Sequence, residues 1–458
     1  MVLDLVDSGY GVGRQFQICI CKQSSVGNAY DRAARSWRHD LSGGWEEFFC
    51  SGETQRVMAS EHYLDHAAGT PPFEQAAAVA AELTMAFPGN PSGLHRRARA
   101  AASLLEEARE RISAECKASP SGVIFTSGGT EADNLAIKGI AFAKRDEGLD
   151  HIIVSSIEHH AVLDSAKWLS TQGFRVELAP VGPDGVVDVA KLANSLTEST
   201  GLVSIMTANN ETGAIQPIPL IAEVVRERAP RAVIHSDACQ AFSSRQIALG
   251  DLGVDALSLS AHKIGGTQGA GAVVLRDGVR IEKIAHGGGQ ELGRRGGTQN
   301  VAAIAAFGVA AQLAAARRAD FLRQAAFLRD LLESQILDIY PEALINASTV
   351  ERLPNILNVT LPGVLAEDIL VLLDRKGVYA STGSACTSGT AQPSHVLLAM
   401  GLAAELARCT LRISFGHTST LEDVKAAADA LAEAASLLSG KEPPAMQKAP
   451  IPRAKVAR

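Results

Sequence analysis

The chain has 458 residues, enough for about two to four domains of ordinary size, which excludes a peptide-scale scaffold. Charged residues make up 20% of the chain, hydrophobic residues make up 46%, and the formal net charge is -7 at pH 7. This composition is typical of a soluble globular protein and lacks the basic excess of proteins that bind nucleic acids or anionic membranes. We therefore expect neither a nucleic acid nor a membrane as a partner.

The cysteines and the N-terminal sequence predict a cytoplasmic protein. Seven cysteines are scattered along the chain, without the even number and spacing of a disulfide framework. Residues 1–13 contain two acidic side chains where a signal peptide would have a basic start and an apolar run. Cys19 and Cys21 form an isolated pair to which we assign no metal.

The elements expected along the chain begin after an N-terminal extension. Residues 1–61 show little periodicity, and we predict that they are dispensable or disordered, with the functional chain starting near Met58. Short apolar segments then alternate with helix-period segments, which predicts an α/β domain with a mostly parallel seven-stranded sheet. The predicted strands are 123–126, 151–155, 175–179, 202–206, 232–235, 256–259 and 271–275.

A second, smaller α/β domain is expected in the C-terminal part. The weakly polar run 301–316 predicts a buried helix too short to span a membrane, and a long helical stretch follows from about residue 317. A strand at 356–361 and a helix at 366–376 come next. The domains we predict are a large one over 74–317, a small one over 62–73 and 318–440, and a disordered, Pro-rich basic tail over 441–458.

Three polar segments follow predicted strands, where ligands bind in open parallel sheets. The turn from Ser127 to Thr130 leads into a helix, and its free N–H groups and the helix dipole favour a phosphate, although a plain capped turn fits the same residues. Asp237 follows a later strand, and Lys263 follows the next one and precedes glycines. Taken alone, these two residues fit a helix cap and a surface lysine. Together the three segments match a pyridoxal phosphate site, in which an acid pairs with the pyridinium nitrogen and a lysine forms a Schiff base.

Cys386 lies in a loop of glycine, serine and threonine residues over 380–390. Structural cysteines prefer apolar burial, so this one is a better candidate nucleophile than Cys116 or Cys239. A chance surface cysteine is the alternative.

The motifs together resemble those of the cysteine desulfurases, which are pyridoxal-phosphate enzymes of the class V aminotransferase fold. The resemblance covers residues 62–438, and the sequence looks most like the NifS-like, nitrogen-fixation type of these enzymes. Its motifs are YLDHAAGTP (63–71), FPGNPSGLH (87–95), FTSGGTEADNLAIKG (125–139), EHHAVL (158–163), ANNETG (208–213), HSDACQ (235–240), SAHKIGG (260–266), GGGQELGRRGGTQN (287–300), RLPNILNV (352–359) and STGSACTSG (381–389).

The resemblance implies the fold-type I, aspartate aminotransferase-like architecture and a role for each matching residue. The implied catalytic residues are Cys386, Lys263 and His159. The implied cofactor-binding residues are Gly129, Thr130, His159, Asn210, Asp237, Gln240, Ser260, His262, Lys263 and Thr298, and the implied substrate-binding residues are Asn90, Asn210 and Arg412. Thr298 would reach the phosphate in a neighbouring subunit, which implies a homodimer. Gln268 and His417 depart from the family pattern, where a lysine and an arginine are frequent.

The implied reaction takes sulfur from L-cysteine, releases L-alanine and leaves a persulfide on Cys386. The sulfur would pass to an iron–sulfur scaffold protein, for nitrogenase maturation, and Cys386 could contact a transient iron–sulfur cluster, although we predict no resident metal site. A housekeeping iron–sulfur desulfurase, a selenocysteine lyase and an aminotransferase remain as alternatives. A non-catalytic assembly platform is disfavoured, since a platform has no chemical reason to keep both Lys263 and Cys386.

Overall fold

The computed structural model describes residues 18–20, 35–37, 61–86, 89–383 and 392–439. The chain divides into two compact units, Met1–Glu61 and His62–Arg458. In the first unit, strand β1 (Ile18–Ile20) pairs antiparallel with β2 (Arg35–Trp37). The predicted tail at 441–458 and most of the predicted extension lie outside the described residues. The second unit carries the rest of the fold.

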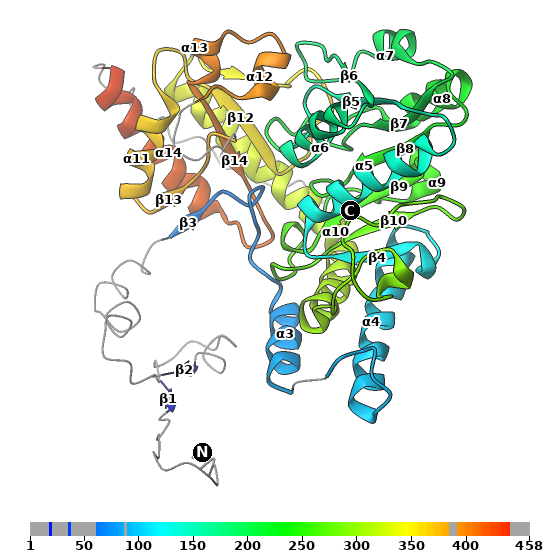
Figure 1. Cartoon of the computed structure of the whole chain (residues 1–458). Coiled ribbons are helices and arrows are strands. Elements are labelled where there is room, and N and C mark those ends of the chain that lie inside the picture. The colour runs from blue at the N-terminus through cyan, green and yellow to red at the C-terminus, as the bar shows by residue number, and fades with distance from the viewer. Residues whose placement is uncertain (1–17, 21–34, 38–60, 87–88, 384–391, 440–458) are drawn as a thin grey trace, which may run out of the picture. The chain divides into compact units, whose positions relative to one another are not determined.

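A seven-stranded sheet forms the centre of the second unit, with the strand order β4-β10-β9-β8-β7-β5-β6 (Figure 1). Strand β10 runs antiparallel to both of its neighbours, and the other strands are parallel to one another. The sheet is therefore mostly parallel, as predicted. Its strands are β4 (Val123–Thr126), β5 (His151–Ser155), β6 (Arg175–Ala179), β7 (Thr200–Ser204), β8 (Val233–Asp237), β9 (Ala256–Ser260) and β10 (Gly271–Leu275).

Helices cover both faces of this sheet, because most of its strands are apolar on both sides. Along β4, Val123 and Phe125 join one buried cluster, while Ile124, which points to the opposite face, joins another. The helices of the first cluster are α3 (Glu74–Ala86), α4 (Arg96–Glu115), α7 (Val189–Ser195), α8 (Ile218–Arg228) and α10 (Val301–Ile339). The helices of the second cluster are α5 (Gly129–Arg145) and α6 (His160–Thr171). The result is a three-layer α/β/α arrangement.

Helix α10 has 39 residues and joins the predicted buried helix over 301–316 to the helical stretch predicted from about residue 317. Asn300 caps its N-terminus by accepting a hydrogen bond from the Ala303 N–H (3.2 Å). Among the described residues, α10 alone is long and apolar enough to cross a membrane, but 56% of its most apolar window is buried inside the protein. This burial is what a core helix shows.

A second apolar core lies around a smaller sheet. Leu328, Leu332 and Ile336 from the second half of α10 pack there, whereas the first half of α10 packs against the large sheet. The smaller sheet has the order β11-β12-β14, with antiparallel pairing. Its strands are β11 (Leu344–Ile345), β12 (Ile356–Thr360) and β14 (Thr410–Ser414). The helices α11 (Ala366–Arg375) and α14 (Leu421–Ser439) contribute to the same core, and the short helices α12 (His395–Ala399) and α13 (Ala404–Ala407) precede β14.

The segment that follows β3 (His62–Tyr63) connects the two cores. Strand β3 pairs in parallel with β13 (Val378–Tyr379) beside the small sheet. The chain then crosses to the large sheet, where the Thr70 N–H donates to the His262 carbonyl (2.9 Å) and the Phe73 N–H donates to the Gly265 carbonyl (2.8 Å). Residues 64–73 therefore lie against the turn that follows β9.

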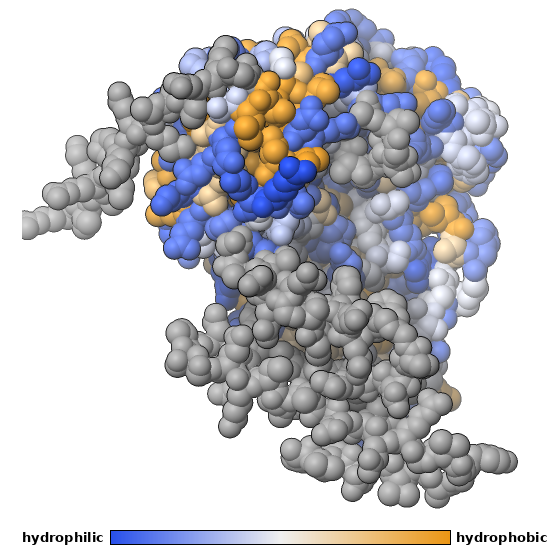
Figure 2. Space-filling view, turned by 90° about the vertical axis from the view of Figure 1, so that its left-hand side faces the viewer, coloured by the Kyte–Doolittle hydropathy of each residue, from blue (hydrophilic) through white to orange (hydrophobic). Residues whose placement is uncertain are grey.

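The outer face of the smaller core carries apolar side chains on its surface. Figure 2 shows an apolar area among hydrophilic atoms on the side where Figure 1 places α11 and α14. Large exposed apolar side chains on these helices and at their ends include Leu365, Val371 and Leu437.

Candidate active site

A cavity of about 500 Å³ lies at the carboxyl ends of β4, β5, β8 and β9, where the sequence motifs place their polar residues. This volume is ordinary for a cofactor site. Its walls come from the large sheet, from the 64–73 segment and from the small-domain strand β14. The lining residues are Ala67, Ala68, Ser127, Gly128, Gly129, Thr130, Glu131, Asp133, His159, His160, Met206, Asn210, Glu211, Asp237, Cys239, Gln240, Ser260, His262, Lys263, Gln268, Gly269, Gly383, His395 and Arg412.

One end of the cavity is built to receive an anion. Helix α5 begins at Gly129, directly after β4, so its unpaired N–H groups and its positive dipole end open into the cavity. A side chain at position 129 would meet the Cys239 sulfur at 3.0 Å and the Ser260 Cβ at 3.2 Å, so this backbone can be approached closely because it is glycine. Ser260 and His262 face one another at 3.0 Å between Oγ and Nδ1. The structure thus brings together the residues that were predicted to hold a phosphate.

An ion pair keeps this cradle in shape. Glu131 accepts a hydrogen bond from the Ser127 N–H (2.7 Å) and pairs with Arg295 (2.7 Å between Oε1 and Nε). These hydrogen bonds lower the pKa of Glu131 against the opposing effect of burial. The 287–300 segment is thereby fixed against the first turn of α5.

Lys263 projects into the middle of the cavity from a single 3-10 turn that follows β9. Its Nζ donates to the carbonyl oxygens of Ala67 (2.5 Å) and Ala68 (2.8 Å). Burial lowers the pKa of Lys263, and the neighbouring Arg412 guanidinium lowers it further. A lysine with a lowered pKa keeps a larger fraction of its amine neutral, as Schiff-base chemistry requires.

Asp237 and Gln240 stand on the sheet side of Lys263. The Asp237 carboxylate is 6% exposed at the end of β8, and one of its oxygens accepts from the Cys239 N–H (2.9 Å). The Gln240 amide donates to the Ala67 carbonyl (2.9 Å), the same oxygen that Lys263 contacts. The structure thus brings both predicted residues to the lysine.

His159 lines the cavity just before α6 and caps that helix. Its Nδ1 accepts a hydrogen bond from the Ala161 N–H (3.1 Å), so the neutral ring carries its proton on Nε2. Burial lowers the pKa of His159, which favours this neutral form. The ring can therefore donate a proton from a defined nitrogen.

Arg412 enters the cavity from β14 and is 3% exposed. Its Nη2 pairs with an Asp65 carboxylate oxygen (2.6 Å), and its Nη1 donates to the Asn210 carbonyl (3.1 Å). Its Nε has no partner within the described part of the chain. The guanidinium is thus held in place by two contacts while it keeps donor capacity for a substrate carboxylate.

Buried acids that the sequence analysis did not single out lie beside these groups. Asp133 is 1% exposed, and burial together with the nearby Asp237 raises its pKa well above its usual range. Burial raises the pKa of Glu158 to about 8, although Glu158 accepts from the Ser155 hydroxyl (2.6 Å) and the Met206 N–H (2.7 Å). Their positions inside the quoted motifs were the available signal, but burial is a tertiary property.

Cys239 is the described cysteine that lines the cavity, and its thiol is not activated. Burial raises its pKa well above the usual value, and the carboxylates of Asp237 and Asp133 raise it further. Burial likewise raises the pKa of Cys116 to about 12. Neither thiol is positioned electrostatically to act as a nucleophile.

Three predicted site residues are not among those that line the cavity of their own chain. Asn90 is exposed, and its side chain accepts from the Ser92 N–H (2.9 Å). Thr298 is exposed on the 287–300 segment. Cys386 lies outside the described residues, but the residues on both sides of that gap, Gly383 and His395, line the cavity.

The sides of the gap are anchored to the cavity wall. The Ser381 N–H donates to the Arg412 carbonyl (3.1 Å), and the Ser394 hydroxyl donates to a Glu211 carboxylate oxygen (2.5 Å). Within the described part of the chain, no cluster of three or more His, Cys, Asp or Glu side chains is suited to a metal ion.

The residues that are present fit pyridoxal phosphate. The N-terminus of α5 suits a phosphate, and the buried Asp237 suits a ring nitrogen that must stay protonated. Lys263 suits a Schiff base, and the cavity has the volume for the group.

Comparisons with known proteins agree with this geometry. Residues 62–427 match the aminotransferase class-V family model. The chain is 42% identical to the cysteine desulfurase IscS of Methanosarcina thermophila over 86% of this chain and 96% of that protein. It is 44% identical to an IscS-like cysteine desulfurase of Mycobacterium tuberculosis over 81% of this chain and 95% of that protein.

The fold matches solved structures over most of the chain. A NifS-like protein superimposes with a TM-score of 0.77 at 34% identity, covering 83% of this chain and 100% of that one. A NifS-like protein from Rickettsia africae superimposes with a TM-score of 0.73 at 32% identity, covering 82% of this chain and 99% of that one. The chain therefore belongs to the class V aminotransferase family and, within it, to the pyridoxal-phosphate-dependent cysteine desulfurases.

Proposed function

We propose that this protein removes sulfur from L-cysteine, releases L-alanine and holds the sulfur as a persulfide on Cys386 for iron–sulfur cluster assembly. The observation that carries this proposal is the convergence on one cavity of Lys263, Asp237, Arg412 and both sides of the loop that contains Cys386. An aminotransferase would use the first three groups but has no need of a thiol beside them.

The substrate is positioned by the small domain and by the buried lysine. Arg412 offers its remaining donors to the L-cysteine carboxylate, which is the group that a planar guanidinium recognises best. Pyridoxal phosphate, when bound, accepts the electrons released as the substrate Cα loses its proton. The neutral amine of Lys263 is the base for that proton, and Asp237 holds the charge of the ring nitrogen.

Cys386 then takes the sulfur. Its thiolate attacks the substrate sulfur and breaks the bond to Cβ, and the electron pair of that bond stays with the three-carbon fragment that leaves as L-alanine after protonation. Cys386 lies three residues after Gly383, and a chain of that length spans at most about 11 Å. Because Cys239 stays protonated and buried, the described cysteines offer no rival nucleophile in the cavity.

The test is a paired product assay. Purified protein is given L-cysteine and a reductant, and L-alanine and sulfide are quantified for the wild type, for Cys386→Ala and for a Cys409→Ala control that changes a buried cysteine outside the cavity. Equal amounts of both products, lost in Cys386→Ala with the cofactor spectrum unchanged and retained in the control, support the proposal. Normal sulfide release by Cys386→Ala refutes it.

A homodimer is part of the proposal. Thr298 is exposed and outside the cavity of its own chain, and the family resemblance gives it a phosphate contact in a neighbouring subunit. Sedimentation analysis of the purified protein tests the dimer. Thr298→Ala should weaken retention of the cofactor without changing the stability of the chain, and a variant that retains the cofactor as wild type does would contradict this role.

The pathway and the compartment are narrower proposals. The relatives named above carry the IscS name, which favours general iron–sulfur assembly. The sequences GRRGGTQN (293–300) and CTSGTAQPSHVL (386–397) resemble those of the nitrogen-fixation type. We propose a scaffold protein in the reducing cytoplasm as the sulfur acceptor. A deletion strain that fails to grow only on dinitrogen would assign the nitrogenase pathway, and one that fails on fixed nitrogen as well would assign the housekeeping pathway. Selenocysteine offered as a competing substrate tests the lyase alternative.

A further inference from the structure

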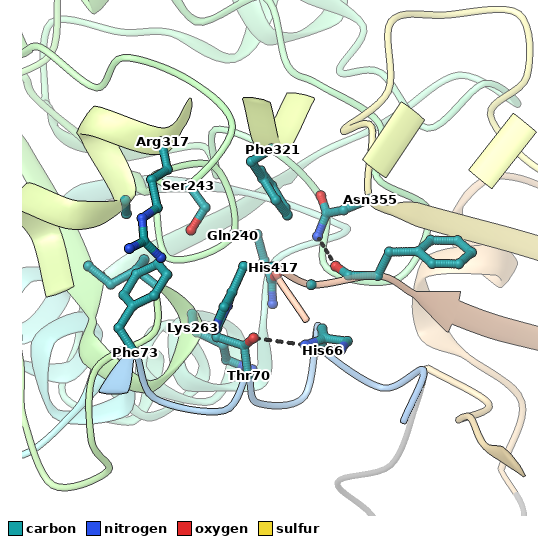
Figure 3. A pocket seen from close by; sticks show the side chains of 14 residues that line it. His66, Thr70, Phe73, Gln240, Ser243, Lys263, Arg317, Phe321, Asn355 and His417 are labelled. Atoms are coloured by element: carbon teal, nitrogen blue, oxygen red, sulfur yellow. Dashed lines mark hydrogen bonds between the residues drawn. The ribbon is translucent and has the colours of Figure 1, made fainter. Parts of the chain in front are cut away.

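A second, smaller cavity adjoins Lys263 and Gln240, which line both cavities (Figure 3). Its volume is about 40 Å³. Since one water-sized probe occupies roughly 10–15 Å³, this space admits a few waters or one small ion and excludes a cofactor or an amino acid. The cavity lies between the first half of α10, the 64–73 segment and the chain that follows β14.

The walls of this small cavity carry basic groups and no carboxylate among the described residues that line it. Its basic groups are Arg317, His417, His66 and Lys263. The acids that act on these groups from outside the cavity are Asp423 on His66, and Asp65 and Asp237 on Lys263. Asp65 is paired with Arg412, Asp423 is paired with His62, and Asp237 accepts from the Cys239 N–H.

Arg317 is the least satisfied of the basic groups. It has no ion pair or hydrogen bond within the described part of the chain, and its guanidinium carbon lies 5.1 Å from the centroid of the Phe73 ring. The His417 ring contacts the same phenyl ring, with centroids 4.3 Å apart, and its nitrogens also have no described partner. Phe73 therefore holds an arginine and a histidine beside one cavity while it supplies neither with a counter-charge.

Burial is the main cause that keeps the two histidines of this cavity neutral. Burial lowers the pKa of His417 to about 4, and the Arg317 charge contributes in the same direction. Burial lowers the pKa of His66 to about 4 as well, with His417 contributing, and both nitrogens of His66 are used by the hydroxyls of Thr70 (2.8 Å) and Ser419 (3.3 Å). At neutral pH the two rings are therefore uncharged, and the described residues supply Arg317 with no counter-ion.

We propose that this cavity binds one small monovalent anion, a halide or hydrosulfide, between Arg317 and His417. Arg317 is exposed on its helix, but it lines the cavity, so an anion there would accept a charge-assisted hydrogen bond from its guanidinium. The His417 N–H and the Ser243 hydroxyl, which also line the cavity, supply neutral donors to complete the shell. The space is too small for phosphate esters, which limits the site to ions of one or a few atoms.

The site adjoins the reactive Lys263, so an anion bound in the site would change the pKa of that lysine. A negative charge beside Lys263 opposes the effect of Arg412 and raises the pKa of the lysine amine. Hydrosulfide, which the reaction of the preceding section releases in the presence of a reductant, and chloride from the solution share the required chemistry. Binding itself is tested without substrate, so failure of this proposal and failure of the desulfurase proposal are distinguishable.

The experiment uses the holoenzyme and bromide as the probe. Crystals soaked in sodium bromide should give an anomalous peak between Arg317 and His417, and the chloride NMR line width should give the affinity in solution. Arg317→Gln should weaken binding by about tenfold or more, because a charged hydrogen-bond partner is lost. His417→Arg should strengthen binding by about tenfold or more, because a permanent charge replaces a neutral ring. Arg323→Gln, an exposed arginine on the same helix, is the matched control.

Opposite shifts in the two variants, with an unchanged control, support the anion site. Absence of a bromide peak in the cavity, or equal affinities in all four proteins, overturns it. Hydrosulfide that displaces bromide in competition assigns the site to the reaction product, and hydrosulfide that fails to do so assigns it to solution halide. Both of these outcomes support an anion site.

Discussion

Replacement of Arg412 by glutamine should raise the KM for L-cysteine by roughly 10- to 150-fold. The guanidinium is 3% exposed and is held by Asp65 and Asn210, so its position is fixed before substrate arrives. A hydrogen bond to a charged partner contributes about 1.5–3 kcal/mol, which converts to that range of affinity. Glutamine keeps one donor but loses the charge and the planar fork.

The same change should move the acid limb of the kcat profile to higher pH. Arg412 lowers the pKa of Lys263, so its removal raises that pKa, and a larger fraction of the amine is protonated at a given pH. The Asp65 side chain is 20% exposed, so water can solvate it after the partner is lost and the chain should still fold.

The assay is steady-state sulfide release from pH 6 to 10, with the exposed Arg375→Gln as control. A thermal unfolding curve checks that the cofactor-loaded variant is folded. A KM within twofold of the wild type, with no displacement of the acid limb, would refute the assignment of Arg412 to the substrate carboxylate.

Three further predictions concern stability. Glu158→Gln should make the protein more stable at pH 8–9 by roughly 3–5 kcal/mol. The folded-state pKa of Glu158, about 8, lies above the unfolded value, so the wild type loses stability as pH rises from about 4.5 to 8. Denaturant unfolding at several pH values checks this, and the same dependence of unfolding free energy on pH in both proteins would contradict it. Glu291→Ala should lower the free energy of unfolding by about 3–5 kcal/mol, because it leaves the 8% exposed Arg109 without its buried partner (3.0 Å). Glu106→Ala removes an exposed partner of the same arginine and should cost about 1 kcal/mol or less in the same unfolding assay. Equal losses in the two variants would contradict the difference in burial. Gly416→Ala should cost about 1–3 kcal/mol, since a Cβ there would lie 2.0 Å from the His66 ring, and an unchanged melting temperature would show that the ring can move away.

The strands of the large sheet were predictable because their apolar character is local. The bounds of β4, β5, β6 and β10 agree with the predicted ones, and β9 differs by a single residue. Strand β7 was predicted over 202–206 and spans Thr200–Ser204. Ile205 and Met206 are buried beyond the end of the strand, so hydrophobicity continues where ladder hydrogen bonds stop.

Strand direction and helix length were less predictable. Strand β10 is antiparallel between β4 and β9, and its sequence resembles that of its parallel neighbours because all are buried on both faces. The apolar run 301–316 marks only the part of α10 that packs against the large sheet, and the helix continues into the second core, where its apolar residues are more widely spaced.

The sequence by itself determined the chemistry of the large cavity, because the residues that follow parallel strands must meet at one edge of the sheet. Lys263, Asp237 and the Gly129 turn were identified in this way, and the motif resemblance added His159, Gln240 and Arg412. The tertiary structure decided the protonation of the buried acids, the pairing of Arg412 with Asp65, and the small basic cavity beside Lys263. These properties depend on burial and on contacts between residues far apart in the chain, which composition and periodicity do not encode.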